Sequence, residues 1–443
     1  MRLPRWAVLI LFVGALSGVV WAKESSATRV GRNNEFLLEL KSPKASERAK
    51  AAGEIGKSGN VSDVPALVNA LHDPSAKVRR QVVLALASFT TPAALNGLIQ
   101  ATTDSDPTVR TLAVEGITGY YTGHPPTTGF VGVIKKGFQS AKRGFAPAET
   151  QVDPGTVVDP QAIAAFERVM MDTHFEEAAR AAARGLGVLD ARSAVPNLIV
   201  AAHSPDENLS LEALNALVKI KDPSAGPKLV DLLKSPHATI QQEAAFAVGF
   251  LKTQSAVPQL QLMAADAPNK TTRLRALEGL AYIGDPVSNP IFQKDLWSHN
   301  KSVRAYAAEG LGRSGDREAL PELLKAAVVE KNARARLAME FALADLGNDE
   351  YLSQMIQALG SRLQGDTAQA YLAELAQKPS FLPKLYPFLS SPNPAIRARL
   401  CLVLMDSGNA LSMPYLQQAS HDRNSTVAAD ALRAINALRA RSE

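Results

Sequence analysis

Apolar residues recur along the chain with a helical spacing that repeats about every thirty residues. After Val78, apolar positions follow at Val82 and Leu86, which is the i, i+4, i+8 pattern of one face of an amphipathic helix. Equivalent starting residues, called anchors below, are Glu47, Val78, Val109, Ala178, Leu209, Ile240, Thr272, Val303, Ala335, Ile396 and Val427. They are separated by 31 or 32 residues, except for one interval of 61, which contains a degraded repeat near Thr367, and one of 69, which contains an insertion. Such a period predicts a chain built from repeated units.

Prolines at two fixed places divide each unit into two predicted helices. The first lies four residues before the anchor, usually after a Ser or Asp that is expected to cap the first helix: Pro43, Pro74, Pro205, Pro236, Pro268 and Pro392. The second lies eighteen residues after the anchor and is expected to begin the second helix: Pro65, Pro196, Pro227, Pro258, Pro290, Pro321 and Pro414. The turn between the helices is assigned to Gly56, Gly187, Gly312 and Gly315, or to Asp190, Asp285 and Asp316. Each unit is thus predicted to be a short helical hairpin.

A single hairpin of this size cannot bury its own apolar face, but stacked neighbours can. The unit resembles the short HEAT-like repeat named after phycobilin lyases, over residues 36–118 and 171–438. The resemblance implies an all-α fold, a right-handed α-solenoid (superhelix) of about 11–12 two-helix HEAT-like repeats with one insertion. We expect the second helices to line its concave wall. The organisation is also similar to that of uncharacterised exported bacterial HEAT-repeat proteins.

The chain begins with the pattern of a signal peptide. Arg2 and Arg5 precede an apolar run of ten residues, and Val20-Trp21-Ala22 resembles a cleavage site. The run is shorter than the roughly 20 residues needed to span a bilayer. We therefore divide the chain into a signal peptide (1–22), N-terminal repeats (23–118), an insertion with a linker (119–170) and C-terminal repeats (171–443), and expect export through the Sec pathway to the periplasm or the medium. Whether the signal is cleaved stays open.

Composition narrows the function classes. Hydrophobic residues make up 46% and aromatic residues only 6%, which suits many short Ala- and Leu-rich helices. The formal net charge is only +5, and the charges are mixed, which argues against a nucleic-acid partner. The single cysteine, Cys401, excludes an internal disulfide, and its place five residues after an anchor predicts a buried thiol.

No catalytic constellation stands out. Deoxyhypusine hydroxylases are built from similar repeats and hold two iron ions through His-Glu pairs, but none of the seven histidines here is followed by Glu. Motifs of hydrolases, metalloproteases and nucleotide-binding loops are missing as well. We therefore predict no catalytic residue, no metal and no cofactor. A metal-dependent hydroxylase or lyase of the HEAT-like class is the remote alternative.

An arginine recurs one residue after the anchor. With Asp73 and Asp104 as partners from the following repeats, it is predicted to form a structural ladder of ion pairs, and a basic stripe for an acidic ligand is the alternative. The ladder residues are Arg48, Arg79, Arg110, Arg273, Arg304, Arg336 and Arg397.

The insertion carries a basic amphipathic pattern. Between Gly119 and Ala148 there is no acidic residue, and in 129–145 the apolar side chains follow helical spacing on one side while lysines and an arginine carry the charge. The candidate partner or membrane contacts are Phe130, Ile134, Lys135, Lys136, Phe138, Lys142, Arg143 and Phe145. The alternative is a loop and helix that pack back on the solenoid.

A long curved wall with few deep pockets favours proteins or peptides over small substrates. We therefore predict a non-catalytic scaffold or adaptor for protein–protein interaction in the cell envelope, binding through the concave surface. The alternative function is a membrane-surface adaptor that uses residues 129–145 on an anionic membrane.

Overall fold

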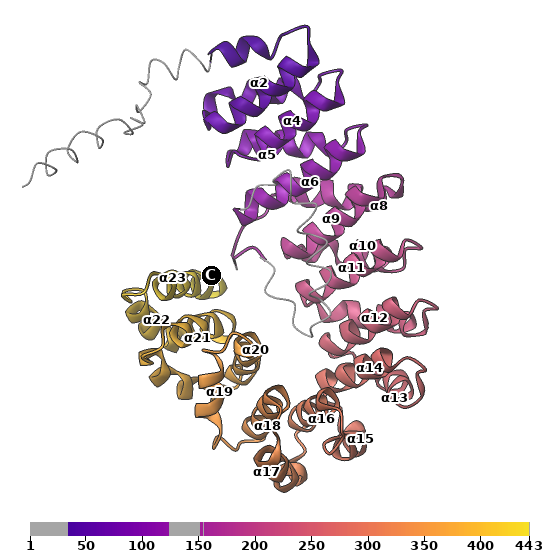
Figure 1. Ribbon diagram of the computed structural model, residues 1–443, viewed down its shortest axis with the longest axis vertical. Helices are drawn as coiled ribbons and strands as arrows, with labels where there is room; N and C mark the ends of the chain where they lie inside the picture. Colours follow the sequence, from indigo (N-terminus) through magenta and orange to yellow (C-terminus); the bar gives the residue numbers. More distant parts are fainter. Residues whose placement is uncertain (1–33, 124–150, 154, 443) are drawn as a thin grey trace, which may run out of the picture.

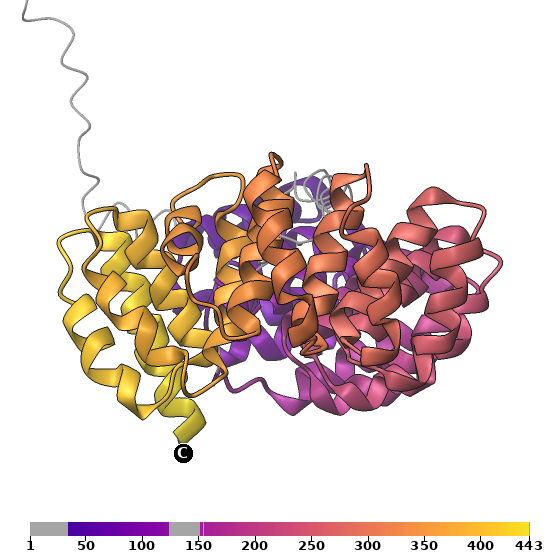
Figure 2. The same ribbon diagram turned by 90° about the horizontal axis from the view of Figure 1, so that it is seen from below.

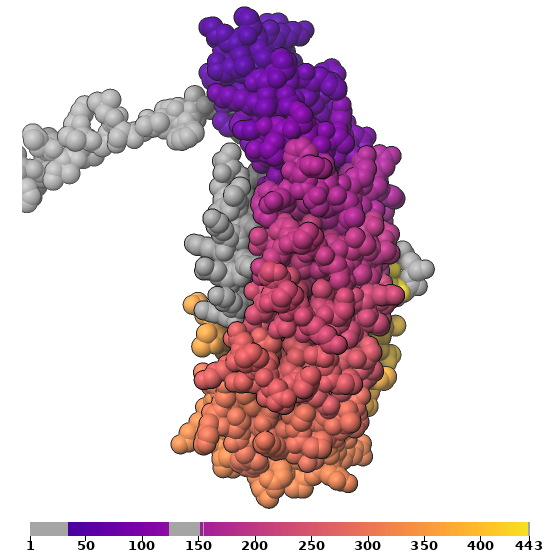
Figure 3. Space-filling model, turned by 90° about the vertical axis from the view of Figure 1, so that its right-hand side faces the viewer, coloured from indigo at the N-terminus to yellow at the C-terminus, as the bar shows by residue number. Residues whose placement is uncertain are grey.

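The structure is a computed structural model, and it describes residues 34–123, 151–153 and 155–442. In these ranges the chain forms helices that pack in pairs along a strongly curved arc, so that the C-terminal helices turn back towards the middle of the chain (Figure 1, Figure 2). Successive repeats follow one another without a gap on the face shown in Figure 3. The prediction of an all-α HEAT-like solenoid is confirmed.

The first helices of the repeats contain the anchors or, in α20, the degraded position near Thr367. They are α2 (Ala45–Ser58), α4 (Ala76–Leu86), α6 (Pro107–Thr122), α9 (Glu176–Val188), α11 (Glu207–Ile220), α12 (Ala238–Phe250), α14 (Lys270–Ile283), α16 (Lys301–Arg313), α18 (Ala333–Asp345), α20 (Gly365–Ala376), α21 (Pro394–Ser407) and α23 (Ser425–Ser442). The second helices are α3 (Val64–Ala70), α5 (Pro92–Ala101), α8 (Pro160–Met171), α10 (Val195–Ala202), α13 (Val257–Asp266), α15 (Asn289–Asp295), α17 (Leu320–Val329), α19 (Leu352–Ala358) and α22 (Met413–Ala419), with the 3₁₀-helices η4 (Pro223–Lys234) and η8 (Leu382–Ser390) in the same layer.

The second prolines start second helices, most often behind a single 3₁₀ turn. Pro65, for example, lies in the first turn of α3, directly after the turn Val61–Asp63. The fixed φ of proline and its missing N–H suit this position. Pro227 differs, because it lies inside the 3₁₀-helix η4.

The first helices, and not the second helices as expected from the sequence, line the concave side from α9 to α20 (Figure 1). The physical reason is the close approach of consecutive first helices. A Cβ on Gly187 of α9 would lie 2.7 Å from Ala216 Cα of α11, and a Cβ on Gly312 of α16 would lie 2.7 Å from Ala342 Cα of α18. Small residues at the crossings let the first helices approach, so the stack curves towards them.

These glycines correct a second expectation. Gly56, Gly187 and Gly312 had been assigned to the turn between helices, but they lie inside α2, α9 and α16. The positive φ values that the turns need belong to other residues, including Gly315 (74°) and Asp190 (50°). Only Gly and a few polar residues adopt this conformation readily.

The segment 119–170, expected to interrupt the stack, includes helix at both ends. The first helix α6 extends to Thr122, and α8 (Pro160–Met171) lies in the layer of second helices beside α9 and α10 (Figure 1). The extra residues therefore enter within the third repeat, between its two helices. Arg110 and Asp172 form an ion pair of 2.7 Å across the extra residues, so the repeats on either side stack directly.

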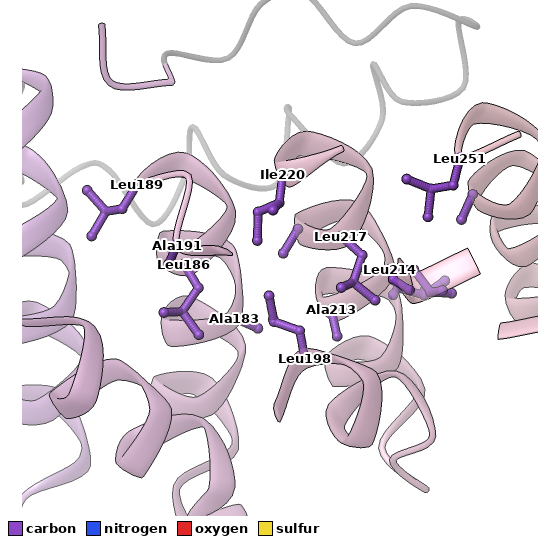
Figure 4. Close-up of a cluster of buried hydrophobic side chains, with 14 of the residues drawn as sticks. Ala183, Leu186, Leu189, Ala191, Leu198, Ala213, Leu214, Leu217, Ile220 and Leu251 are labelled. Atoms are coloured by element: carbon purple, nitrogen blue, oxygen red, sulfur yellow. The ribbon is translucent and has the colours of Figure 1, made fainter. Parts of the chain in front are cut away.

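The core is a continuous layer of aliphatic side chains between the helices. Figure 4 shows one part of it, where Leu186 of α9, Leu198 of α10 and Leu217 of α11 lie between neighbouring helices. All three are fully buried. Each interface between repeats is apolar in the same way, and nearest-neighbour burial of this kind stabilises a solenoid.

Candidate binding surface

The predicted ladder arginines share one contact. In each of the seven, a guanidinium nitrogen donates to the backbone carbonyl six residues before it, as Arg79 does to Asp73 O over 2.9 Å. This contact closes the turn before the first helix. This hydrogen bond holds each arginine side chain against the turn of its own repeat.

Five of the seven arginines also bind a carboxylate of the following repeat. The pairs are Arg48–Asp73 (2.6 Å), Arg79–Asp104 (2.7 Å), Arg110–Asp172 (2.7 Å), Arg304–Glu330 (2.6 Å) and Arg397–Asp422 (2.7 Å). In Arg48 and Arg79 the contact is bidentate, through Nε and Nη2. The Arg48 guanidinium holds the pKa of the Asp73 carboxyl below its ordinary value. Outside the insertion, the acidic partner follows its arginine by 25 or 26 residues.

Within the described residues, Arg273 and Arg336 have no such partner, because serine stands at the equivalent position, Ser298 and Ser361. These serines keep the local role of the acid: Ser361 Oγ accepts a hydrogen bond from Leu363 N, as Asp73 Oδ1 does from Ser75 N. The repeats with serine at this position therefore keep the hydrogen bond of the turn but lose the negative charge that would pair with the arginine.

The inner face of the arc carries a second set of polar and aromatic side chains, which the sequence reading missed. The set is most complete in α14 and α16, three, six and ten residues after the anchor, at Arg275, Glu278 and Tyr282 and at Tyr306, Glu309 and Arg313. Arg313 of α16 pairs with Glu309 (2.9 Å) and with Glu374 of α20 (2.9 Å), and Tyr371 Oη donates to Glu309 Oε1 over 2.6 Å. The pair of α16 and α20 spans two repeats, which side chains can bridge only on the inside of a curve. We call Arg313, Glu309, Glu374 and Tyr371 the inner cluster.

Arg313, Glu309 and Tyr371 of the inner cluster have buried side chains, Glu374 is half-buried, and aromatic rings surround the cluster. The Arg313 guanidinium lies 4.7 Å from the ring centre of Tyr282 and 5.0 Å from that of Phe341, which stacks on Tyr371 at 4.4 Å. Burial alone would lower the pKa of Arg313, but the carboxylates of Glu374 and Glu309 hold it well above its ordinary value. A buried and fully paired cation of this kind fixes geometry, since removal of one partner leaves an uncompensated charge.

The stripe continues towards the N-terminal repeats. Arg275 of α14 contacts Glu278 (2.7 Å) and Glu243 of α12 (3.5 Å), and Arg184 of α9 pairs with Glu212 of α11 (2.8 Å). Desolvation raises the pKa of the Glu243 carboxyl. In α4 and α11 the equivalent positions hold Leu84 and Asn215, which are half-buried. The inner face thus carries charged, polar and aromatic groups mainly from α9 to α20.

A short segment within the insertion joins the middle of the arc to its end. Gln151 Nε2 donates to Lys219 O of α11 over 2.9 Å, and Val152 N donates to Val188 O of α9 over 3.1 Å. Asp153 in turn accepts from Arg433 of α23 at 2.8 Å. We call residues 151–153 the crossing segment, because they connect repeats that lie far apart in the sequence.

Cys401 is fully buried in α21, and burial raises the pKa of its thiol to about 12. Among the described residues, no three or more His, Cys, Asp or Glu side chains are grouped so that they could hold a metal ion. In the same part of the chain, no helix is long and apolar enough to cross a membrane.

The proposed signal peptide and the basic part of the insertion lie outside the described residues. This holds for all the candidate contacts of the insertion, namely Phe130, Ile134, Lys135, Lys136, Phe138, Lys142, Arg143 and Phe145.

A family model for HEAT repeats matches residues 34–118, 163–249 and 257–344, which together make up more than half of the chain. A search of curated proteins finds no match.

Among solved structures, the chain is similar to human deoxyhypusine hydroxylase in complex with glycerol (17% identity, TM-score 0.27, covering 66% of this chain and 99% of the other). It is also similar to the karyopherin Kap121p bound to the extreme C-terminus of the protein phosphatase Cdc14p (13% identity, TM-score 0.43, covering 93% and 50%). A third match is the complex of CpcE and CpcF of phycocyanin lyase from Nostoc (20% identity, TM-score 0.27, covering 56% and 86%). The chain spans about half the length of Kap121p. The family follows from the repeat model together with the stacked hairpins: this chain is a member of the HEAT-repeat family.

Proposed function

We propose that this protein is a non-catalytic scaffold of the cell envelope that binds protein partners along the concave face of its arc. HEAT-repeat solenoids typically act as protein-interaction scaffolds. The observation that carries the proposal is the half-buried part of the stripe on the inner face of the first helices, which includes the aromatic rings of Phe246, Phe250 and Tyr282. Such side chains supply both apolar area and hydrogen bonds to a partner.

The experiment compares inner-face and outer-face variants of the full chain. Leu84→Arg and Asn215→Arg introduce a bulky charge on the inner face, whereas Val200→Arg and Leu262→Arg do so at exposed positions of the second helices α10 and α13. Chemical cross-linking in intact cells, followed by mass spectrometry, identifies proteins that attach to the wild type. The proposal predicts that the inner-face variants lose these partners and that the outer-face variants keep them. Unfolding temperatures check that all four variants fold.

The envelope location is supported by the pattern of residues 1–22, in which two arginines precede an apolar run and a cleavage-like Val20-Trp21-Ala22. Fractionation of the producing cells tests it. Full-length protein in the cytoplasm, with an intact N-terminus, would contradict export. Partner binding by the inner face does not depend on this outcome.

A second proposal is contact with an anionic membrane through residues 129–145. It is supported by the basic residues of this segment and by the absence of acidic residues from 119 to 148. Co-sedimentation with vesicles of anionic lipid, with and without a deletion of 129–145, tests it. Binding that survives the deletion would reject this proposal.

A further inference from the structure

A pocket opens where the ladder lacks its acid. It has a volume of about 640 Å³ and lies between α18 and α19, at the degraded repeat near Thr367. Arg336 and Ser361 both line it, together with Lys331. In a continuous ladder the following repeat would supply a carboxylate at the position of Ser361.

The chain itself indicates what an arginine at this position binds. Five other ladder arginines hold a carboxylate of the next repeat at 2.6 to 2.7 Å. Arg336 donates through Nε and Nη2 to the carbonyl of Glu330, which holds the side chain close to its own turn. It forms no ion pair within the described part of the chain, and its side chain is exposed.

A buried carboxyl lies in the same pocket. Glu340, on the turn of α18 after Arg336, is only 5% exposed and has no hydrogen-bond partner among the described residues. Its position, five residues after the anchor, holds a buried apolar residue in other repeats, as Val83, Leu214 and Cys401 show. A charged residue at a core position of this kind is costly unless something binds it or it is protonated.

Charge decides the class of ligand. Burial raises the pKa of the Glu340 carboxyl to about 7, with Arg336 opposing the rise, so at neutral pH this group is partly protonated. The other ionisable groups that line the pocket are Lys331 and Arg336, while α19 contributes only uncharged side chains, among them Gln354 and Gln357. The pocket therefore carries net positive charge, and a protonated carboxyl can donate a hydrogen bond to an anion.

We propose that this pocket binds an acidic side chain, Asp or Glu, of an extended segment of a partner protein, in place of the missing ladder carboxylate. Arg336 and Lys331 meet the carboxylate, and Gln354 and Gln357, which also line the pocket, supply amide groups for the backbone of the segment. The inference rests on the proposed function, since it names a feature of the protein partner.

The test measures binding of two short peptides to the full chain by fluorescence anisotropy at low salt. Both peptides alternate Gly-Ser with one other residue and carry blocked termini; one contains glutamate and the other glutamine. The wild type is expected to bind the glutamate peptide at least about tenfold more tightly, because a charge-assisted pair forms only there.

The decisive variant is Ser361→Asp. It places a carboxylate 25 residues after Arg336, the spacing of three of the native pairs, and keeps the acceptor for Leu363 N. It is expected to raise the unfolding temperature and to remove the preference for glutamate. Ser298→Asp fills the equivalent gap beside Arg273, a residue that is not among those lining the pocket, and should leave the preference unchanged. Arg336→Gln should remove the preference without the gain in stability.

Equal binding of the two peptides, or a preference that survives Ser361→Asp, would overturn the inference. Displacement of the peptide by inorganic phosphate at lower concentration than by free glutamate would overturn it as well, since the pocket would then be a phosphate site. The outcome is separate from that of the inner-face variants. Loss of partners in Leu84→Arg or Asn215→Arg supports the proposed function even if the peptides show no preference.

Discussion

Arg433 Nη2 donates to Asp153 Oδ1 over 2.8 Å, although the two residues lie 280 positions apart in the sequence. Both side chains are about half exposed, at 45% and 57%, so the pair alone contributes less than about 1 kcal/mol. Its importance is geometric. Together with the hydrogen bonds from the crossing segment to backbone carbonyls of α9 and α11, it ties the last repeat of the arc to the middle repeats.

We predict that Gly155→Leu opens the arc. Gly155 has a φ of 89°, and a Cβ there would lie 2.5 Å from Ala440 Cβ of α23, so a larger side chain must push the terminal helix away. The maximum dimension of the particle in small-angle X-ray scattering should increase. Gly59→Leu is the control, because Gly59 also has a positive φ (67°) but has no atom within 4 Å of the added Cβ. It should cost about 1–2 kcal/mol of stability without a change of shape. Equal profiles for both variants would contradict the prediction.

Two glycines of α2 should respond in opposite directions to alanine. A Cβ on Gly56 would lie 2.8 Å from Ala85 Cα of α4, so Gly56→Ala should separate these helices and destabilise the protein by about 1–3 kcal/mol. A Cβ on Gly53 meets only the Gln81 side chain at 3.5 Å, so Gly53→Ala should stabilise the helix by about 0.5–1 kcal/mol. Urea denaturation of the two variants measures both effects. A destabilised Gly53→Ala would show that the close contact between α2 and α4 extends from Gly56 to Gly53.

Neighbouring arginines of α4 should differ in their contribution. Arg79 and Asp104 are 13% and 9% exposed, so Arg79→Gln leaves a partly buried carboxylate and should lower the free energy of unfolding by about 1–3 kcal/mol. Arg80 pairs with Asp106 but is 42% exposed, and Arg80→Gln should cost less than about 1 kcal/mol. Thermal unfolding at low and high salt compares them. The contribution of the Arg80–Asp106 pair to stability should decrease as the salt concentration rises. A similar salt dependence for the Arg79–Asp104 pair would contradict its partial burial.

Glu340 should make the protein less stable as the pH rises. The folded carboxyl has a pKa of about 7 against 4.5 ordinarily, so the folded state holds its proton to higher pH than the unfolded state. Stability is therefore lost between these two values, and Glu340→Gln should be more stable than the wild type above about pH 7 by about 1–3 kcal/mol. Near pH 4 the two should differ little. Chemical denaturation across this range tests the slope, with the exposed Glu350→Gln as control. A difference that does not vary with pH would contradict the assignment.

The sequence predicted the repeat because the signal is local and recurrent. A proline such as Pro65 and the anchor that precedes it lie in one hairpin, and their spacing alone indicates two helices. The side of the curve could not be predicted in this way. It depends on which helices approach most closely. Gly187 and Gly312 were assigned to turns because, in a sequence, a glycine near a helix end can either terminate the helix or allow close contact with a neighbouring helix.

The inner cluster was missed for a related reason. Arg313 and Glu374 are 61 residues apart and belong to repeats that are not neighbours, so no spacing rule of a single interface connects them. A signal does exist: charged and aromatic residues recur six and ten residues after the anchor, as Glu278, Glu309 and Tyr282 show. The Arg79–Asp104 type of pair, by contrast, joins adjacent repeats at a fixed spacing that is visible in the sequence.

The bond between Arg313 and Glu374 has a mechanical consequence. When a curved rod is pulled straight, distances along its inner edge lengthen. Stretching this part of the arc must therefore break a largely buried ion pair before the helices can separate. The repeats before α9 have no such bridge across two repeats among the described contacts. Under load, the N-terminal repeats should therefore yield first, while the section from α16 to α20 behaves as a stiff bend.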